Sequence, residues 1–134
     1  MNGIEFGNDE EIVAAFVEES KEHLIELENG ILWLERNGLP KRDVAGTPVP
    51  DMFRSTHSIK AGAALFRLEK IEKIAHAVEN VLQNIRQCEI EIDMERANAL
   101  LQGKDRMDKM LESPFESNDI DISPLLERLS EFSH

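Results

Sequence analysis

Cysteine, tyrosine and long apolar runs are scarce or absent in this 134-residue sequence. The one cysteine, Cys88, cannot form an internal disulfide, which excludes a disulfide-stapled secreted scaffold. The N-terminus lacks the basic stretch and apolar run of a signal peptide, and no segment approaches the roughly 20 apolar residues that span a bilayer. We therefore expect a cytoplasmic protein that is not inserted in a membrane.

Basic residues are also outnumbered, since 27 acidic and 15 basic residues give a formal net charge of −12. This charge repels nucleic-acid phosphates and anionic membrane surfaces, so neither is an expected partner. With 41% hydrophobic residues, the chain can bury one ordinary core without metal or disulfide. Helix formers dominate and strand-like runs of Val, Thr and aromatic residues are few, so we expect an all-α fold.

Apolar residues recur at helical spacing in separate segments of the chain. The predicted helices are at about 9–37, 49–66, 69–88, 93–113 and 123–132. Asn8 with Glu11 resembles a capping box that starts the first helix, and Ile12 begins its inward-facing stripe. The segment 38–50 is rich in proline and glycine and predicts a loop.

The first four of these helices are amphipathic and favour an antiparallel four-helix bundle over about 9–113. The short helix at about 123–132 is expected to pack on the outside or the end of that bundle. The acidic, turn-rich segment 113–121 predicts a flexible joint before it. We expect one domain over 1–134, and the pattern gives no reason to expect more than a monomer.

His57 is predicted to face solvent from the second helix. At 100° per residue, the core stripe around Met52 and Ile59 lies about 200° away from it. The side chains expected near it on the exposed face are Phe53, Lys60, Ala61 and Ala64. Because Ala61 and Ala64 are small, a partner protein can reach the imidazole, and Phe53, Ala61 and Ala64 become candidate partner-binding residues.

Folding the second and third helices into a hairpin about Leu68 brings further polar residues to this face. The midpoints of 57 and 79 and of 60 and 76 are both 68, so His57 is expected level with Glu79 and Lys60 level with His76. A carboxylate that accepts a hydrogen bond from one ring nitrogen leaves the lone pair of the other free to attack. The cluster therefore suits phosphoryl transfer to His57, with Lys60 offsetting the negative charge.

Two segments of the chain carry a resemblance to a known family. These are residues 53–60, FRSTHSIK, and 68–80, LEKIEKIAHAVEN. Together they resemble the histidine-phosphotransfer (HPt) domain at the N-terminus of chemotaxis kinases of the CheA type. The resemblance is close over about 50–86, and the flanking helices match in length and pattern. The specific signal is the occurrence of both segments at this separation.

The resemblance implies a role for each residue of the cluster. In that family the first histidine accepts a phosphoryl group from a separate ATP-binding kinase domain and passes it to an aspartate of a response-regulator receiver. It follows that His57 is the phosphoacceptor, Lys60 its cationic neighbour, and His76 with Glu79 its supporting hydrogen-bond network. The kinase domain and receiver domains are then the expected partners.

The resemblance further implies that the chain is a portion of a protein histidine kinase, although a stand-alone phosphotransfer protein is the alternative. The sequence has neither a P-loop nor another glycine-rich phosphate cradle. We therefore expect no cofactor in this chain, no catalytic site that works without a partner, and ATP bound by a separate domain.

One position departs from the family pattern. The family usually has glycine directly after the lysine, whereas this chain has Ala61 followed by Gly62. At 100° per residue, Gly62 lies about 140° from His57, towards the core. The extra methyl group of Ala61 is therefore expected to affect the fit or the rate of transfer, and not which residue accepts the phosphoryl group.

Two other functions fit parts of this pattern. Helical bundles can hold dinuclear metal centres through Glu-x-x-His motifs. The residues three positions before His23, His57 and His76 are Ser20, Arg54 and Lys73, so we expect no metal there. A non-catalytic adaptor could dock a receiver or kinase through the same face, but it would not need an imidazole, a cation and a carboxylate at one level.

Overall fold

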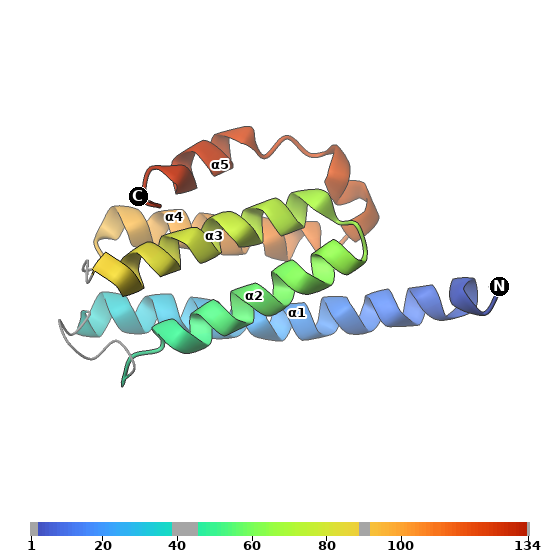
Figure 1. Ribbon diagram of the computed structural model, residues 1–134, viewed down its shortest axis with the longest axis horizontal. Coiled ribbons are helices and arrows are strands. Elements are labelled where there is room, and N and C mark those ends of the chain that lie inside the picture. Colours follow the sequence, from blue (N-terminus) through green and yellow to red (C-terminus); the bar gives the residue numbers. More distant parts are fainter. Residues whose placement is uncertain (1–2, 39–45, 89–91, 134) are drawn as a thin grey trace.

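A computed structural model gives the fold of the chain (Figure 1). It describes residues 3–38, 46–88 and 92–133, and within these the side chains of 3–9 and of Cys88 are not described. The helices are α1 (Gly3–Asn37), α2 (Val49–Leu65), α3 (Glu69–Cys88), α4 (Met94–Met110), the 3₁₀ helix η2 (Pro114–Asp119) and α5 (Ser123–Ser130). The described segments contain no strand, and the all-α prediction is confirmed.

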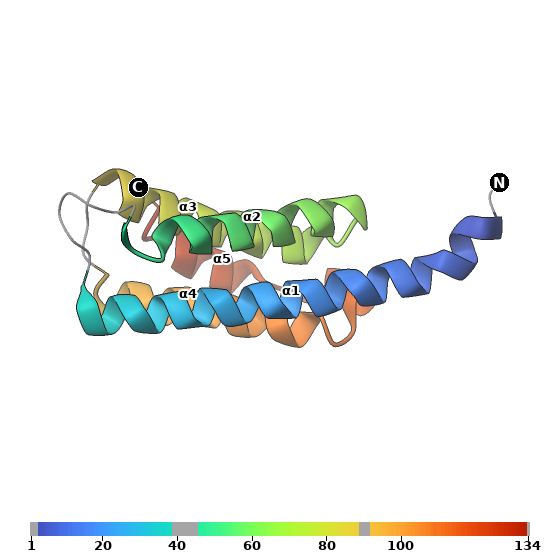
Figure 2. The ribbon, with the colours of Figure 1, turned by 90° about the horizontal axis from the view of Figure 1, so that it is seen from below.

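Helices α1 to α4 form an antiparallel bundle in which each helix runs opposite to the next (Figures 1 and 2). Helix α2 packs against α1 and α3, and α4 closes the bundle against α1 and α3. Helix α5 lies against α3 and α4 and runs back along the bundle (Figure 1). The predicted four-helix bundle with an additional C-terminal helix is therefore confirmed.

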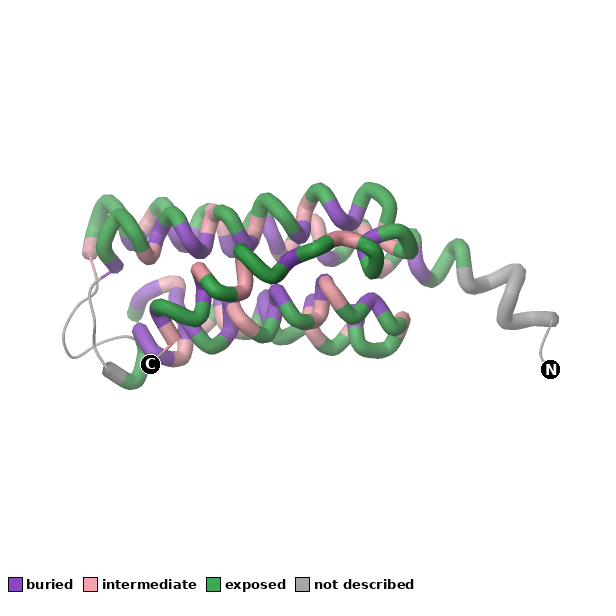
Figure 3. Tube along the Cα trace, turned by 90° about the horizontal axis from the view of Figure 1, so that it is seen from above, coloured by how far each residue is buried: buried purple, intermediate pink, exposed green. Residues whose placement is uncertain are grey.

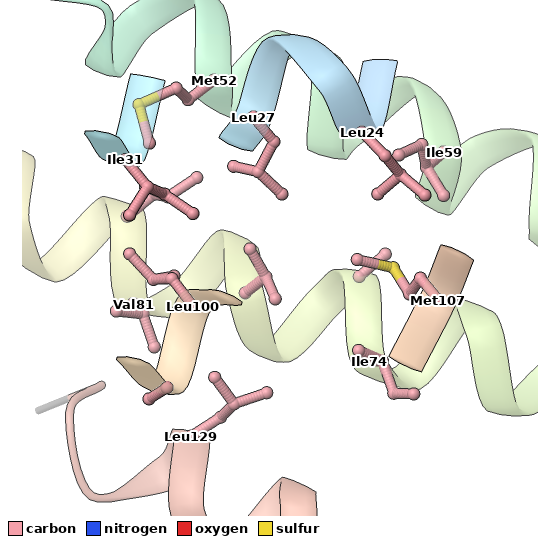
Figure 4. Packing of buried hydrophobic residues seen from close by; sticks show 14 of the residues in the cluster. Leu24, Leu27, Ile31, Met52, Ile59, Ile74, Val81, Leu100, Met107 and Leu129 are labelled. Carbon is pink, nitrogen blue, oxygen red and sulfur yellow. The ribbon is translucent and has the colours of Figure 1, made fainter. Parts of the chain in front are cut away.

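The core follows from the apolar stripe of each helix. Buried positions recur on the inner faces of the helices and exposed positions on the outer faces (Figure 3). The side chains that meet at the centre include Leu24, Leu27, Ile31, Met52, Ile59, Ile74, Val81, Leu100, Met107 and Leu129 (Figure 4). Each large apolar side chain buried in this way contributes about 1.5–3 kcal/mol to stability.

A tight turn joins α2 to α3 and fixes their relative height. Arg67 has a positive φ of 58°, its N–H donates to Ala64, and the N–H of Leu68 donates to Ala63. This pair of hydrogen bonds is the Schellman ending of a helix, in which the left-handed position is usually glycine. Leu68 is fully buried beneath the turn. The hairpin therefore pivots at Leu68, as the sequence predicts.

The start of α1 differs from the prediction. The helix runs through Asn8, so the predicted capping box at Asn8 and Glu11 is wrong. Ile12, expected in the core, is 48% exposed, because the buried stripe of α1 begins at Val13 and the preceding turns extend beyond the bundle (Figure 2). Although α1 has 35 residues, no helix in the described part of the chain is apolar enough over enough length to cross a membrane.

The predicted flexible joint at 113–121 is instead a packed element. Its main part is η2, which contacts α3 and α4. Ser117 is fully buried there and its hydroxyl donates to the carbonyl of Pro114. Asn118 donates a side-chain hydrogen bond to the carbonyl of Arg67 at 3.0 Å. Side-chain hydrogen bonds to the backbone thus order a segment that composition alone assigns to a loop.

Candidate functional site

His57 stands on the outer face of α2, near the middle of the helix. Its side chain is 59% exposed, whereas the neighbouring Thr56 and Ile59 are fully buried. The hydroxyl of Thr56 donates to the carbonyl of Met52 within the same helix, which satisfies its polar group in the core. The stripe that buries one side of α2 therefore holds the imidazole in solvent, as predicted.

Glu79 on α3 connects two side chains of α2. Its Oε2 lies 2.9 Å from Nδ1 of His57, and its Oε1 accepts a hydrogen bond from Nζ of Lys60 at 2.7 Å. The Glu79 side chain is only 9% exposed, so both of its oxygens are held in a nearly buried position. The predicted alignment of His57 with Glu79 across the hairpin is confirmed.

The surroundings of Glu79 keep its carboxyl ionised. Burial raises the pKa of Glu79, but the hydrogen bonds and charges of Lys60 and His57 lower it by more, so that the pKa lies below its ordinary value of 4.5. Near neutral pH this group is a carboxylate that can only accept hydrogen bonds.

The ionised state of Glu79 determines the tautomer of His57. Because the carboxylate cannot donate, Nδ1 of His57 carries the proton of the 2.9 Å hydrogen bond. In the neutral ring the lone pair is then on Nε2, on the opposite side of the imidazole from the carboxylate. The arrangement can therefore present a nucleophilic nitrogen to solvent and stabilise the positive charge that the ring gains when Nε2 forms a new bond.

Lys60 lies one helical turn after His57, and its side chain is 25% exposed. Its ammonium group is held by Glu79 on the same side of α2 as the imidazole. It is thus a fixed cation close to a group that could receive an anion.

His76 does not join the hydrogen-bonded set in the way the resemblance implies. It is exposed, and its ring forms no hydrogen bond or ion pair with any side chain that the structure describes. It lines a surface hollow together with Lys60, which agrees with the predicted shared height of these two residues. The part of His76 in the chemistry stays a prediction.

The predicted partner-binding residues differ in exposure. Ala61 and Ala64 are exposed, but Phe53 is half-buried against the core, and the guanidinium of Arg86 lies 5.1 Å from the centre of its ring. Leu65, which the sequence reasoning did not single out, is 77% exposed. Its place on the outer face could have been found by the same helical-wheel argument that located His57.

A second surface that sequence reasoning missed lies on the α1 side of α2. It is a hollow with a mainly apolar lining, formed by Ile12, Ala15, Phe16, Glu19, Ser20, His23, Ser58, Gly62, Leu65 and Phe66. Ser58, the residue after His57 in α2, is part of this lining. The signal was hidden because Ile12 and Phe16 have the spacing of core residues.

The described residues contain no group of three or more His, Cys, Asp or Glu side chains that could hold a metal ion. The polar cluster of the site is thus one carboxylate shared between an imidazole and an ammonium group.

Comparison with known proteins identifies the family. A family model described as the Hpt domain matches residues 11–113 of the chain. The chain belongs to the Hpt domain family.

Relatives of this Hpt chain include chemotaxis proteins CheA from several organisms. It is 31% identical to CheA of Treponema pallidum in a match that covers 96% of the chain. It is 30% identical to CheA of Halobacterium salinarum over 84% of the chain. The matches cover only 15% and 16% of the length of these two relatives.

Solved structures share the Hpt fold. The solution structure of the histidine phosphotransfer domain of CheA has a TM-score of 0.76 and 25% identity, and the match covers 93% of each chain. The phosphorylated P1 domain of CheA3 from R. sphaeroides, in complex with CheY6, has a TM-score of 0.74 and 24% identity over 90% of this chain and 94% of that one. The likeness to this second structure concerns the fold.

The Ala61–Gly62 order of this Hpt domain has a structural reason on the Gly62 side. A Cβ atom at Gly62 would lie 2.4 Å from Cε1 and 2.6 Å from Cδ1 of Phe16 on α1. Glycine therefore lets α1 approach α2 closely at this point. Ala61 points away from this contact and is exposed, so its methyl group changes the surface and not the helix packing.

Proposed function

We propose that this chain is a phosphocarrier domain of two-component signalling. His57 accepts a phosphoryl group from an ATP-binding kinase domain and passes it to an aspartate of a response-regulator receiver. The observation that carries the proposal is the 2.9 Å hydrogen bond from Nδ1 of His57 to Glu79, which leaves Nε2 of an exposed ring free to react.

The chemistry is a nucleophilic substitution at phosphorus. The lone pair of Nε2 attacks the terminal phosphorus of ATP and forms the N–P bond, while the bond to the bridging oxygen breaks and its electrons leave with ADP. The ring becomes a phosphorylated imidazolium whose Nδ1–H remains hydrogen bonded to the Glu79 carboxylate. Lys60 offsets part of the negative charge that the phosphoryl group brings.

The second half of the reaction reverses the role of His57. An aspartate oxygen of the receiver attacks the same phosphorus, an O–P bond forms, and the N–P bond breaks with its electrons returning to Nε2. The imidazole is then neutral again and Glu79 still holds its Nδ1–H. The same arrangement of His57 and Glu79 thus serves both steps, and the chain is unchanged at the end of the cycle.

The similarity to CheA supports a place in a chemotaxis kinase. The chain corresponds to a small part of CheA relatives. We propose that ATP is bound by a separate kinase domain. The present Hpt domain then acts in the cytoplasm and needs no cofactor of its own. The hollow between α1 and α2, whose lining includes Ser58, is the surface on which we propose that the receiver docks. In R. sphaeroides, the phosphorylated P1 domain of CheA3 forms a complex with CheY6.

The test is phosphorylation by the kinase domain of the same signalling system with radiolabelled ATP. We expect uptake of label that is lost in acid, because the N–P bond of phosphohistidine is acid-labile and phosphoserine is stable. His57→Gln should abolish this uptake. His23→Gln on α1 is the matched control and should retain it, since His23 pairs with Glu19 and Glu26 and not with Glu79.

Two results would contradict the proposal. Acid-labile label on the His57→Gln variant would place the acceptor elsewhere. If the unaltered chain took up no label and yet bound the receiver, the module would be an adaptor without phosphotransfer chemistry.

A further inference from the structure

A surface hollow of about 340 Å³ lies between α2 and α3, beside the acceptor. Its lining consists of Lys60, Glu72, Lys73 and His76. It is connected to the acceptor through Lys60, whose ammonium group binds the same carboxylate that holds the His57 ring. The Lys60 end of the hollow is one helical turn from the imidazole, and Lys73 lies six residues before Glu79, about 9 Å along α3.

The charges of this hollow are not equally available to a ligand. The ammonium group of Lys60 is already paired with Glu79 at 2.7 Å. Lys73 is exposed, and its ammonium group pairs with none of the side chains that the structure describes. Glu72 also lines the hollow and opposes an anion there, but its single negative charge is outnumbered by the charges of the two lysines. Of the two lysines in this hollow, Lys73 is therefore the one whose charge is available to a ligand.

The two sides of α2 differ in chemistry. The hollow on the α1 side is lined mainly by apolar groups and contains Glu19 and no lysine or arginine. The hollow on the α3 side has two lysines and one glutamate, and each of the two hollows has one histidine. An ATP donor brings several negative charges next to His57, and the leaving ADP gains more during the reaction. The α3 side is therefore the side that fits the phosphates.

We propose that Lys73 is a positioning residue for phosphorylation. With Lys60 and His76 it faces the phosphates of the ATP donor in this hollow while Nε2 of His57 attacks. The inference rests on the proposed function and deepens it. Lys73 forms and breaks no bond in the step: it offsets the negative charge that moves to the leaving ADP as the P–O bond breaks. Because no nucleotide takes part in transfer to the receiver, Lys73 has no role in that second step.

The experiment measures phosphorylation of the Lys73→Gln variant by the ATP-binding kinase domain, with the concentration of the chain varied. We expect kcat to fall roughly 5-fold, the size of one partly exposed ion pair, with little change in KM. Lys73→Arg should restore most of the rate. Lys109→Gln, which removes the same charge from an exposed site on α4, should behave like the unaltered chain.

Two further measurements separate a phosphate contact from a general effect. Phosphorylated Lys73→Gln should pass its phosphoryl group to the receiver at the normal rate. With phosphoramidate, a donor without a nucleotide, Lys73→Gln should be phosphorylated as fast as the unaltered chain. A normal kcat with ATP, a change in KM alone, or equal slowing with phosphoramidate would overturn the role of Lys73.

Failure of this inference can be told from failure of the proposed function. If His57→Gln takes up no label and Lys73→Gln is phosphorylated normally, only the role of Lys73 is wrong. If His57→Gln still takes up acid-labile label, the proposed acceptor is wrong and the inference about Lys73 is wrong with it.

Discussion

At the scale of single residues, the chemistry of the site depends on Glu79. This carboxylate fixes the proton of His57 on Nδ1 and holds Lys60 in place with its other oxygen. The tautomer of the imidazole and the position of the cation are therefore coupled through one side chain. Removing the charge of Glu79 should disturb both.

The variant Glu79→Gln tests the orienting role. Glutamine keeps the size and one acceptor oxygen but has no charge to stabilise the imidazolium that forms with the N–P bond. We expect the initial rate of phosphorylation to fall about 10- to 100-fold, the range seen when a metal-binding histidine loses the carboxylate that orients it. Glu127→Gln, an exposed position on α5, is the matched control. Equal rates in the two variants would remove Glu79 from the mechanism.

The pKa of Glu79 provides a second prediction at this scale. A carboxyl titration followed by NMR should give Glu79 a midpoint below its ordinary 4.5, because the effects of Lys60 and His57 exceed that of burial. Lys60→Met should raise this midpoint, whereas Lys109→Met should not.

The stability that Glu79 contributes should depend on pH in a defined direction. Since its folded pKa is lowered, the contribution is fully present above 4.5 and is lost as the pH falls through the folded pKa. In the NMR titration, a Glu79 midpoint at or above 4.5, or one that Lys60→Met leaves unchanged, would show that the ion pair between Lys60 and Glu79 is not formed in solution.

The sequence could predict most of this cluster because helical geometry is regular. His57 faces outward by its angle to Ile59, and Glu79 lies opposite it because the turn at Leu68 is tight. Equal height does not determine hydrogen bonding, however. His76 has the expected level, but the structure gives its ring no hydrogen bond to Glu79, which is bonded to His57 and Lys60.

At the scale of helices, the contact of α1 with α2 depends on the absence of a side chain at Gly62. Gly62→Ala should gain about 1 kcal/mol of helix propensity but lose about 1–3 kcal/mol because the new methyl group overlaps the Phe16 ring. We expect a net loss of about 1 kcal/mol in chemical denaturation. Ala61→Gly should cost a similar amount through propensity alone, since Ala61 is exposed.

The same substitution in a Phe16→Ala variant tests the Gly62 prediction more sharply. With Phe16→Ala present, the overlap is gone, and Gly62→Ala should then stabilise the chain relative to Phe16→Ala alone. If Gly62→Ala had the same effect in both backgrounds, the close approach of α1 and α2 at this point would be wrong.

Helix positions were predictable where an amphipathic stripe was long and a proline or glycine ended it. The predictions failed where a tertiary contact, or the absence of one, determines the local structure. Nothing between Gly3 and Asn8 ends a helix, so α1 starts earlier than its expected cap. Arg67 occupies a left-handed backbone position where glycine is usual. Asn118 donates a hydrogen bond to the carbonyl of Arg67, and this contact orders the segment that was expected to be a flexible joint. Neither contact has a local sequence signal.

At the scale of the whole molecule, α5 is part of the packed structure although the family match ends at residue 113. Leu129 is fully buried and lies near the site where Gly103 of α4 approaches Val78 of α3. The sequence predicted this helix and its external position, but composition could not show that it seals the contact between α3 and α4.

The variant Leu129→Ala tests the packing of α5. Loss of a fully buried leucine should lower the free energy of unfolding by about 2–5 kcal/mol in urea denaturation. Leu125→Ala, at a half-buried position of the same helix, should cost less. The initial phosphorylation rate of folded protein should not change, because His57 and Glu79 lie on other helices. Unchanged stability of Leu129→Ala would show that α5 is not docked in solution.

The central claim is that the phosphoryl group is attached to Nε2 of His57 while Nδ1 donates to Glu79. The most direct measurement is a nitrogen-15 NMR spectrum of the phosphorylated chain with labelled histidines. The account predicts phosphorus coupling at Nε2 of His57 and a protonated Nδ1. Coupling at Nδ1 of His57, or at the ring of any other histidine, would contradict it.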